Sequence, residues 1–450
     1  MGMNTTPAKL LVVAWVGCLA AVSAWAGAQS DRVSKGVLIP SILLIAPIES
    51  TPLDGQIRAS QSRLSRTAMR GPELEKLGWL FIAKARASSD PGYNTLAAVA
   101  ADTLERDFEL PHAAWLLRGH VMQTRHRFAE AEDLGRRLVA VRGAPADFAL
   151  LGDALYDRGR INEAARAYQQ MMDLKPSLDS YTRAANIRWI KGDLAGAIEL
   201  QTLAVRSGGP RDAGSLAWSL VRLAHFVWQD GNGSHADALA GRALALVPDF
   251  QPALLLQGRI LLSSGAALAA LAPLARAAEL LPEPESLWVY AEALRAAGRA
   301  DEATAVETRL IREGAAEDPR TVAVFLATHG RNPELALQLA TGEFNDRADV
   351  MTHAACGLVL AGAGRIEEAA THGRASLSEG TVDARLLLHA ARIAALAGQP
   401  EARGLADRAG RLSALLLPSE RKLLEATLVL LPAGSRPPGD THETTPQKTS

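Results

Sequence analysis

The segment from Leu150 to Pro176, LLGDALYDRGRINEAARAYQQMMDLKP, carries apolar residues at intervals of three and four positions. This spacing is typical of amphipathic helices, and Gly159 interrupts it in the middle. Pro176 follows the second apolar run, where a proline ends a helix because it has no backbone N–H to donate. The pattern therefore predicts two helices joined by a turn, with the small residues Gly152 and Ala164 where the two helices approach each other closely.

The same pattern recurs along the chain with a period of about 34 residues, which predicts an array of repeats and not a set of separate domains. The proline that ends the second helix recurs as Pro248 and Pro282. The turn glycine and the small residue of the second helix recur as Gly192/Ala197, Gly231/Ala236, Gly265/Ala270, Gly298/Ala303, Gly330/Ala336, Gly364/Ala369 and Gly398/Ala402.

These residues resemble the motif of tetratricopeptide repeat (TPR) proteins, and the resemblance covers roughly residues 112–417. The match is closest over residues 145–178, through Phe148, Leu151, Gly152, Leu155, Gly159, Ala164, Tyr168 and Pro176. The resemblance implies an all-α fold, a right-handed α-α superhelix (solenoid) of about nine to ten TPR-like helix pairs.

Residues 1–28 have the order of a secretory signal peptide: Lys9, an apolar run from Leu10, and small residues ending at Ala28. We expect cleavage after Ala28 and an exported protein, periplasmic or extracellular. Cleavage after Ala26, an uncleaved anchor and a lipid on Cys18 remain open alternatives. The preference for Arg over Lys and the abundance of Ala and Leu are typical of a GC-rich bacterial genome.

The mature chain is expected to divide into five segments. Residues 29–52 form an extended apolar N-terminal segment, either laid over exposed core or acting as a mobile contact element. Residues 53–111 form a cap helix and a divergent helical repeat. Residues 112–417 form the TPR array, and residues 418–431 a capping helix of the kind that solenoids require. Residues 432–450, rich in Pro and Thr, are expected to be disordered.

Composition and motifs narrow the classes of function. Removing residues 1–28 takes one Lys and no acid, so the formal charge changes from −1 (48 − 49) to −2 (47 − 49), which gives no general attraction for nucleic acid. Only Cys356 then remains, so no intrachain disulfide is expected. No catalytic motif is present, and no segment of about 100 residues is left for a catalytic domain. His120, His126 and Glu130 are close in sequence, but we expect no metal site and no cofactor.

The resemblance also implies a concave groove, lined in TPR proteins by positions 2, 5, 9, 12 and 13 of each first helix. We expect a non-enzymatic scaffold of the bacterial cell envelope that binds a protein or peptide there, with no transmembrane span. The alternatives are a chaperone or assembly factor for an outer-membrane or secreted complex, and a binder of cell-wall glycan. The residues of this predicted groove are Asn186, Trp189, Trp218, Val221, His225, Trp228, Gln229, Leu255, Arg259, Trp288 and Arg295.

Overall fold

The structure is a computed structural model that describes residues 38–48, 51–67, 69–88, 90–209 and 212–431. The expected signal peptide, residues 29–37 and the tail 432–450 lie outside the described residues. Within these ranges the chain forms α-helices and short 3-10 turns and no β-strand. The all-α fold class predicted from the repeats is therefore confirmed.

The helices of the described ranges pack as ten successive antiparallel pairs between a first and a last single helix, α2 (Pro52–Leu64) and α23 (Pro418–Leu430). The pairs are α3 (Arg70–Ser88) with α4 (Gly92–Asp107), α5 (Pro111–Thr124) with α6 (Phe128–Val141), α7 (Pro145–Asp157) with α8 (Ile161–Leu174), α9 (Leu178–Ile190) with α10 (Leu194–Ser207), α11 (Ala213–Gln229) with α12 (Gly233–Leu246), α13 (Gln251–Ser263) with α14 (Ala267–Leu280), α15 (Pro284–Ala296) with α16 (Ala300–Glu317), α17 (Pro319–Thr328) with α18 (Pro333–Asp346), α19 (Val350–Gly362) with α20 (Ile366–Ser376), and α21 (Ala384–Leu396) with α22 (Ala402–Arg411).

The repeat residues explain how each pair is built. Every turn glycine that recurs from Gly159 to Gly398 has a positive φ, a conformation that L side chains rarely adopt. A Cβ on Gly152 would collide with the ring of Tyr168, so the lack of a side chain at Gly152 makes room for that ring between the two helices. Ala164 is fully buried, and the Tyr168 hydroxyl donates a hydrogen bond of 2.8 Å to Asp153.

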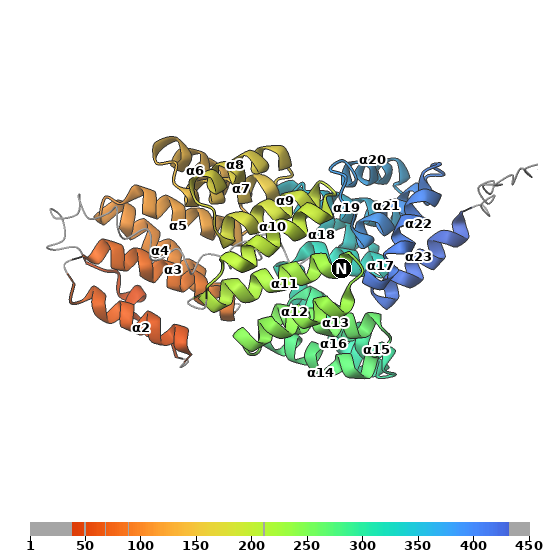
Figure 1. The fold of residues 1–450 in the computed structure, drawn as a ribbon, viewed down its shortest axis with the longest axis horizontal. Coiled ribbons are helices and arrows are strands. Elements are labelled where there is room, and N and C mark those ends of the chain that lie inside the picture. The colour runs from red at the N-terminus through yellow and green to blue at the C-terminus, as the bar shows by residue number, and fades with distance from the viewer. Residues whose placement is uncertain (1–37, 49–50, 68, 89, 210–211, 432–450) are drawn as a thin grey trace, which may run out of the picture.

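The superhelix folds back so that its C-terminal pairs occupy its own concave side. Figure 1 shows α9–α11 beside α17–α21, although these helices are far apart in the sequence. The Thr381 hydroxyl donates to the carbonyl of Ile190 at 2.6 Å, and the Gln229 amide donates to the carbonyl of Val382. These two hydrogen bonds hold the connection between α20 and α21 against the ends of α9 and α11.

A buried ion cluster makes a second closing contact. The guanidinium of Arg347, which is completely buried, pairs with Asp157 at 2.6 Å, with Asp349 at 3.0 Å and with Glu343 at 3.4 Å. It also lies 5.6 Å from the ring centre of Phe128 on α6. A charge can be buried in this way only where opposite charges surround it, so the connection between α18 and α19 is held firmly against α7.

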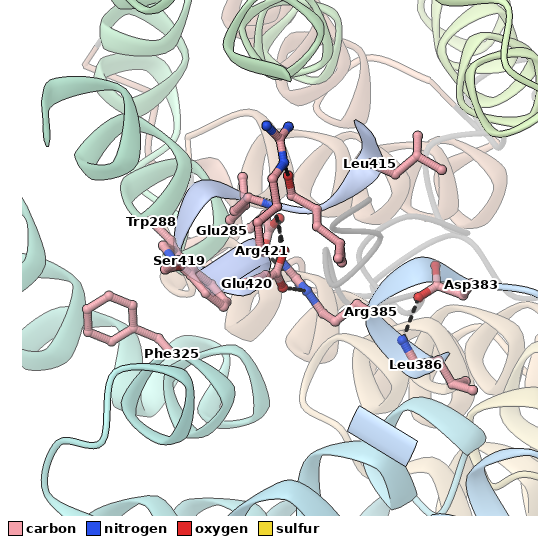
Figure 2. A network of polar contacts seen from close by, with 12 residues as sticks. Glu285, Trp288, Phe325, Asp383, Arg385, Leu386, Leu415, Ser419, Glu420 and Arg421 are labelled. Carbon is pink, nitrogen blue, oxygen red and sulfur yellow. Dashed lines mark hydrogen bonds and ion pairs between the residues drawn. The ribbon is translucent and has the colours of Figure 1, made fainter. Parts of the chain in front are cut away.

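The last helix, α23, and the short turn η6 (Ser413–Leu415) pack against α13, α15 and α21. Figure 2 shows the polar network at this junction. Arg385 on α21 pairs with Glu420 on α23 and with Glu285 on α15. The C-terminal helix therefore joins two parts of the array that are separated by several repeats of sequence.

The apolar segment before α2 is only partly covered. It forms the turn η4 (Ser41–Leu44), in which Leu43 is fully buried and the Gln61 amide donates to two carbonyls of the segment. Leu38, Ile45 and Ile48 are exposed by 66% or more. In the described residues, none of the helices has both the length and the apolar character that crossing a bilayer requires.

Candidate binding cavity

The predicted groove is not an open surface in this structure. Most of its residues lie on the inward side of the first helices, where the chain's own α19–α23 and their connections cover them. The expectation of an exposed concave groove is corrected accordingly. Nine of the eleven side chains are at most 8% exposed: Asn186, Trp189, Trp218, Val221, Trp228, Gln229, Leu255, Arg259 and Trp288.

The tryptophans near the middle of the array act as core residues. The Trp189 indole N–H donates to the side-chain oxygen of Gln229 at 2.7 Å, and that glutamine binds the backbone of Val382 in turn. Trp228 and Val221 belong to the same apolar cluster as several residues of α21. These contacts satisfy the polar atoms of Trp189 and Gln229 within the chain and leave their faces no room for a partner.

The C-terminal segment packs over the predicted groove residues of α13 and α15. The Arg385 guanidinium lies 4.7 Å from the ring centre of Trp288, and both residues appear in Figure 2. Arg259 pairs with Glu285 and donates at 3.2 Å to the carbonyl of Leu415. Trp288 and Arg259 are therefore sites at which the array binds its own C-terminus.

The two remaining groove residues differ from this pattern. His225 is half-buried, and burial, helped by the nearby Arg222, lowers its pKa to about 3. Arg295 is exposed and binds Glu307 on the neighbouring helix at 2.7 Å. Arg295 thus pairs within its own repeat instead of pointing into a shared groove.

A cavity of about 990 Å³ lies elsewhere, between the N-terminal pairs and the middle of the array. Its walls come from α3, the start of α4, the end of α5, the start of α11, and α18. The connections α12–α13, α14–α15 and α16–α17 complete it. We call this space the axial cavity. Of the predicted groove residues only Trp218 lines it, so sequence reasoning missed most of this site.

The axial cavity is rich in carboxylates. Asp212 caps α11 by accepting the Ser215 N–H at 3.1 Å. Burial raises the pKa of Glu343, but a hydrogen bond from His126 and the charge of Arg347 outweigh burial and hold the pKa at about 2. Among the described lining residues the acidic ones are Asp212, Asp249, Glu283, Glu317, Glu343 and Asp346, against Arg125 and His126 as the basic ones.

The rest of the wall is mostly apolar. Ile82 on α3, Trp218 on α11 and Leu339 on α18 line the space, together with Phe250 and Leu281 from the connections. The side-chain oxygen of Asn94, also in this wall, is buried and accepts no hydrogen bond from the part of the chain that the structure describes. The cavity therefore offers apolar contact and several carboxylate acceptors.

Three further polar residues that stand out in the sequence, His120, Glu130 and Cys356, lie apart from the axial cavity. The described residues contain no group of three or more His, Cys, Asp or Glu side chains arranged to hold a metal ion. His120 is buried against Trp79, whereas Glu130 pairs with Arg127 at the surface. Cys356 is buried, and burial raises the pKa of its thiol to about 12, which disfavours the reactive thiolate.

Comparisons with known proteins identify no family for this chain. No protein family and no curated protein sequence matches it. Among solved structures it is similar to a human IFIT1 dimer with PPP-AAAA, with a TM-score of 0.47 and 14% identity over 80% of this chain and 86% of that one. It is equally similar to the APC/C hetero-tetramer Cut9-Hcn1, with a TM-score of 0.47 and 13% identity over 86% of this chain and 79% of that one. Similarity at this level identifies no ligand.

Proposed function

We propose that this protein is a non-enzymatic scaffold that binds a segment of a partner protein in the axial cavity. The observation that carries the proposal is the cavity itself, about 990 Å³ lined by both apolar and acidic side chains. Ligand sites in proteins are typically concave, mostly apolar and about 300–1,000 Å³ in volume. A space at the upper end of that range accommodates several side chains of a polypeptide.

The position of the cavity also supports a macromolecular partner. Much of its wall consists of connections between repeats, which contribute polar residues such as Asp249 and Glu283 beside apolar ones such as Leu281. A mixed wall of this kind suits an extended chain, whose side chains alternate in character and whose backbone needs hydrogen-bond partners.

The glycan alternative loses its structural basis. It required tryptophan faces on which sugar rings could stack, but Trp189, Trp218, Trp228 and Trp288 are at most 6% exposed. The chaperone or assembly-factor alternative differs from the scaffold in the number of partners, and the same experiment separates them.

The test is selection of peptides that fill the cavity. Random dodecapeptides are displayed and selected on the full chain, and the enriched sequences are measured singly by fluorescence anisotropy. Gly342 lines the cavity, and a Cβ there would meet nothing within 4 Å, so Gly342→Phe adds a ring at the cavity wall with no clash at its Cβ. Gly404→Phe, at an exposed helical glycine that is equally open, is the matched control.

We expect Gly342→Phe to weaken the selected peptides at least tenfold, about 1.4 kcal/mol, and Gly404→Phe to leave them unchanged. Equal binding by both variants would place the binding surface outside the axial cavity and refute the proposal. Enrichment of a few related sequences supports a scaffold with one partner, and enrichment of many unrelated ones supports the chaperone alternative.

We also propose that the protein acts in the cell envelope, on the basis of its N-terminal sequence. Expression in a bacterial host followed by fractionation and mass spectrometry of the N-terminus is the measurement. We expect a periplasmic or secreted chain that begins at Gln29. A cytoplasmic chain that retains residues 1–28 would contradict this assignment.

A further inference from the structure

We propose that the segment accepted by the axial cavity is cationic, with lysine or arginine side chains next to aliphatic ones. This inference rests on the proposed function and specifies the chemistry of the partner.

The charge of the cavity wall is the first observation. Six carboxylates and one arginine are found among its described lining residues, which gives a formal charge of −5 (1 − 6) when His126 is neutral, whereas the whole chain is close to neutral at −1. A concave surface of one sign raises the local concentration of oppositely charged groups and speeds their association. The same surface repels the phosphates of nucleic acid.

The carboxylates of the cavity wall differ in how much negative charge they offer to a ligand. Glu343 is already paired with buried Arg347, and Asp249 binds Arg276 at the surface. Asp212 accepts a backbone N–H, a neutral donor that leaves the full negative charge on the carboxylate, and Asp346 is exposed at the end of α18. The last two therefore offer charge to a ligand at little cost to the fold.

The neutral part of the wall is the second observation, because it offers apolar surface beside the carboxylates. An ammonium or guanidinium group supplies several donors to those carboxylates. Ile82, Leu281 and Leu339 offer apolar surface to the carbon chain of lysine or arginine and to neighbouring aliphatic residues.

The experiment uses the full chain and three fluorescent dodecapeptides. One repeats the triplet Lys-Leu-Ser, and in the other two Gln or Glu replaces every Lys. The test variant is Asp212→Asn/Asp249→Asn/Asp346→Asn, which changes charge but little shape. Asparagine also preserves the helix cap at 212 and tolerates the positive φ at 249. The control variant, Asp301→Asn/Glu334→Gln/Glu367→Gln, removes three exposed carboxylates outside the cavity lining.

We expect the lysine peptide to bind at least tenfold more tightly than the glutamine peptide, and the glutamate peptide to bind most weakly. The triple cavity variant should weaken the lysine peptide at least tenfold, the control variant should not, and added salt should weaken it further. Equal affinity for the lysine and glutamine peptides, or no effect of the cavity variant, would overturn the inference. So would tighter binding of a single-stranded RNA of similar length.

Gly342→Phe separates this failure from failure of the proposed function. If it weakens all three peptides alike, the axial cavity binds polypeptide without selecting charge, and only the inference on charge fails. If the peptides bind the wild type and Gly342→Phe changes nothing, the cavity is not the binding site and both proposals fail. If no peptide binds, both proposals fail as well.

Discussion

Substitution of one turn glycine tests whether the superhelix closes on itself in solution. Gly192 joins α9 to α10 with a φ of +79°, and a Cβ there would lie 2.5 Å from the carbonyl oxygen of Gly380, in the connection that folds back from α20. Gly265 joins α13 to α14 with a nearly equal φ of +82°, and a Cβ there would meet nothing within 4 Å. The two glycines thus differ only in the closing contact.

Two effects should lower the free energy of unfolding of Gly192→Ala, and only one of them applies to Gly265→Ala. Alanine in the left-handed region costs about 1–2 kcal/mol at either position. At Gly192 the Cβ would also lie 2.5 Å from Gly380, whereas real Cβ atoms essentially never come closer than 3.0 Å to another heavy atom. The obstacle is backbone, held nearby by the hydrogen bond from Thr381 to Ile190. Forcing extra volume into a packed contact costs about 1–3 kcal/mol. We therefore expect Gly192→Ala to cost about 2–5 kcal/mol and Gly265→Ala about 1–2 kcal/mol.

The assay has to resolve local stability, because the expected effect is confined to one connection and the helices beside it. Hydrogen exchange followed by mass spectrometry reports on the connection after α20 and on α21 separately from the rest. Gly192→Ala should speed exchange across residues 377–396, which are remote from it in sequence, whereas Gly265→Ala should affect only α13 and α14. Similar effects of the two variants, each confined to its own turn, would refute the closed arrangement.

Further predictions concern the same closing contacts. Arg347→Ala leaves Asp157 buried without its partner and should cost about 3–5 kcal/mol in urea denaturation, and a loss below about 1 kcal/mol would place the pair in solvent. Burial raises the pKa of Asp383 to about 6 from 3.8, so the stability linked to this group is present below about pH 4 and is lost as the pH rises through 6. Between pH 4 and pH 7 this loss is about 3 kcal/mol of the free energy of unfolding. Asp383→Asn should remove that pH-dependent difference, which urea titrations at the two pH values measure. Trp228→Ala should cost about 3–5 kcal/mol in thermal or urea unfolding, whereas a binding role alone would leave stability unchanged. Truncation after Pro282 should leave helices, seen by circular dichroism, but should expose core and increase binding of an apolar dye; an unchanged dye signal would contradict the covered concave side.

The features of the fold that could be predicted from the sequence are those that depend on residues close together in the chain. The period of about 34 residues, the turn glycines and the small residues at helix contacts are local, since each repeat packs mainly against the next. The path of the whole superhelix is not local, because small rotations between repeats add up along the array. Whether its concave side stays open depends on that sum, and no single repeat encodes it.

Helix α11 shows why the closed arrangement could not be predicted from the sequence. Its polar residues recur every three or four positions and form one polar stripe, which is typical of a helix with a free face: Ser215, Ser219, Arg222, His225 and Gln229. The structure nevertheless buries four of these five residues. The axial cavity gave no signal either, because residues such as Asp249 and Glu283 lie in connections whose arrangement only the complete fold determines.

The closed arrangement of the superhelix also bears on whether the protein is a scaffold with one partner or a chaperone with many. Proteins that accept many clients use flexible surfaces, often rich in methionine, that repack around each ligand. The axial cavity has no methionine among its described lining residues, and one of its walls, α18, ends in the buried cluster of Arg347, Asp157 and Asp349. A wall fixed by buried charges adapts little, and a site formed in advance gains affinity for the one shape that fits it. This supports our proposal of a scaffold with one defined partner over a chaperone with many clients.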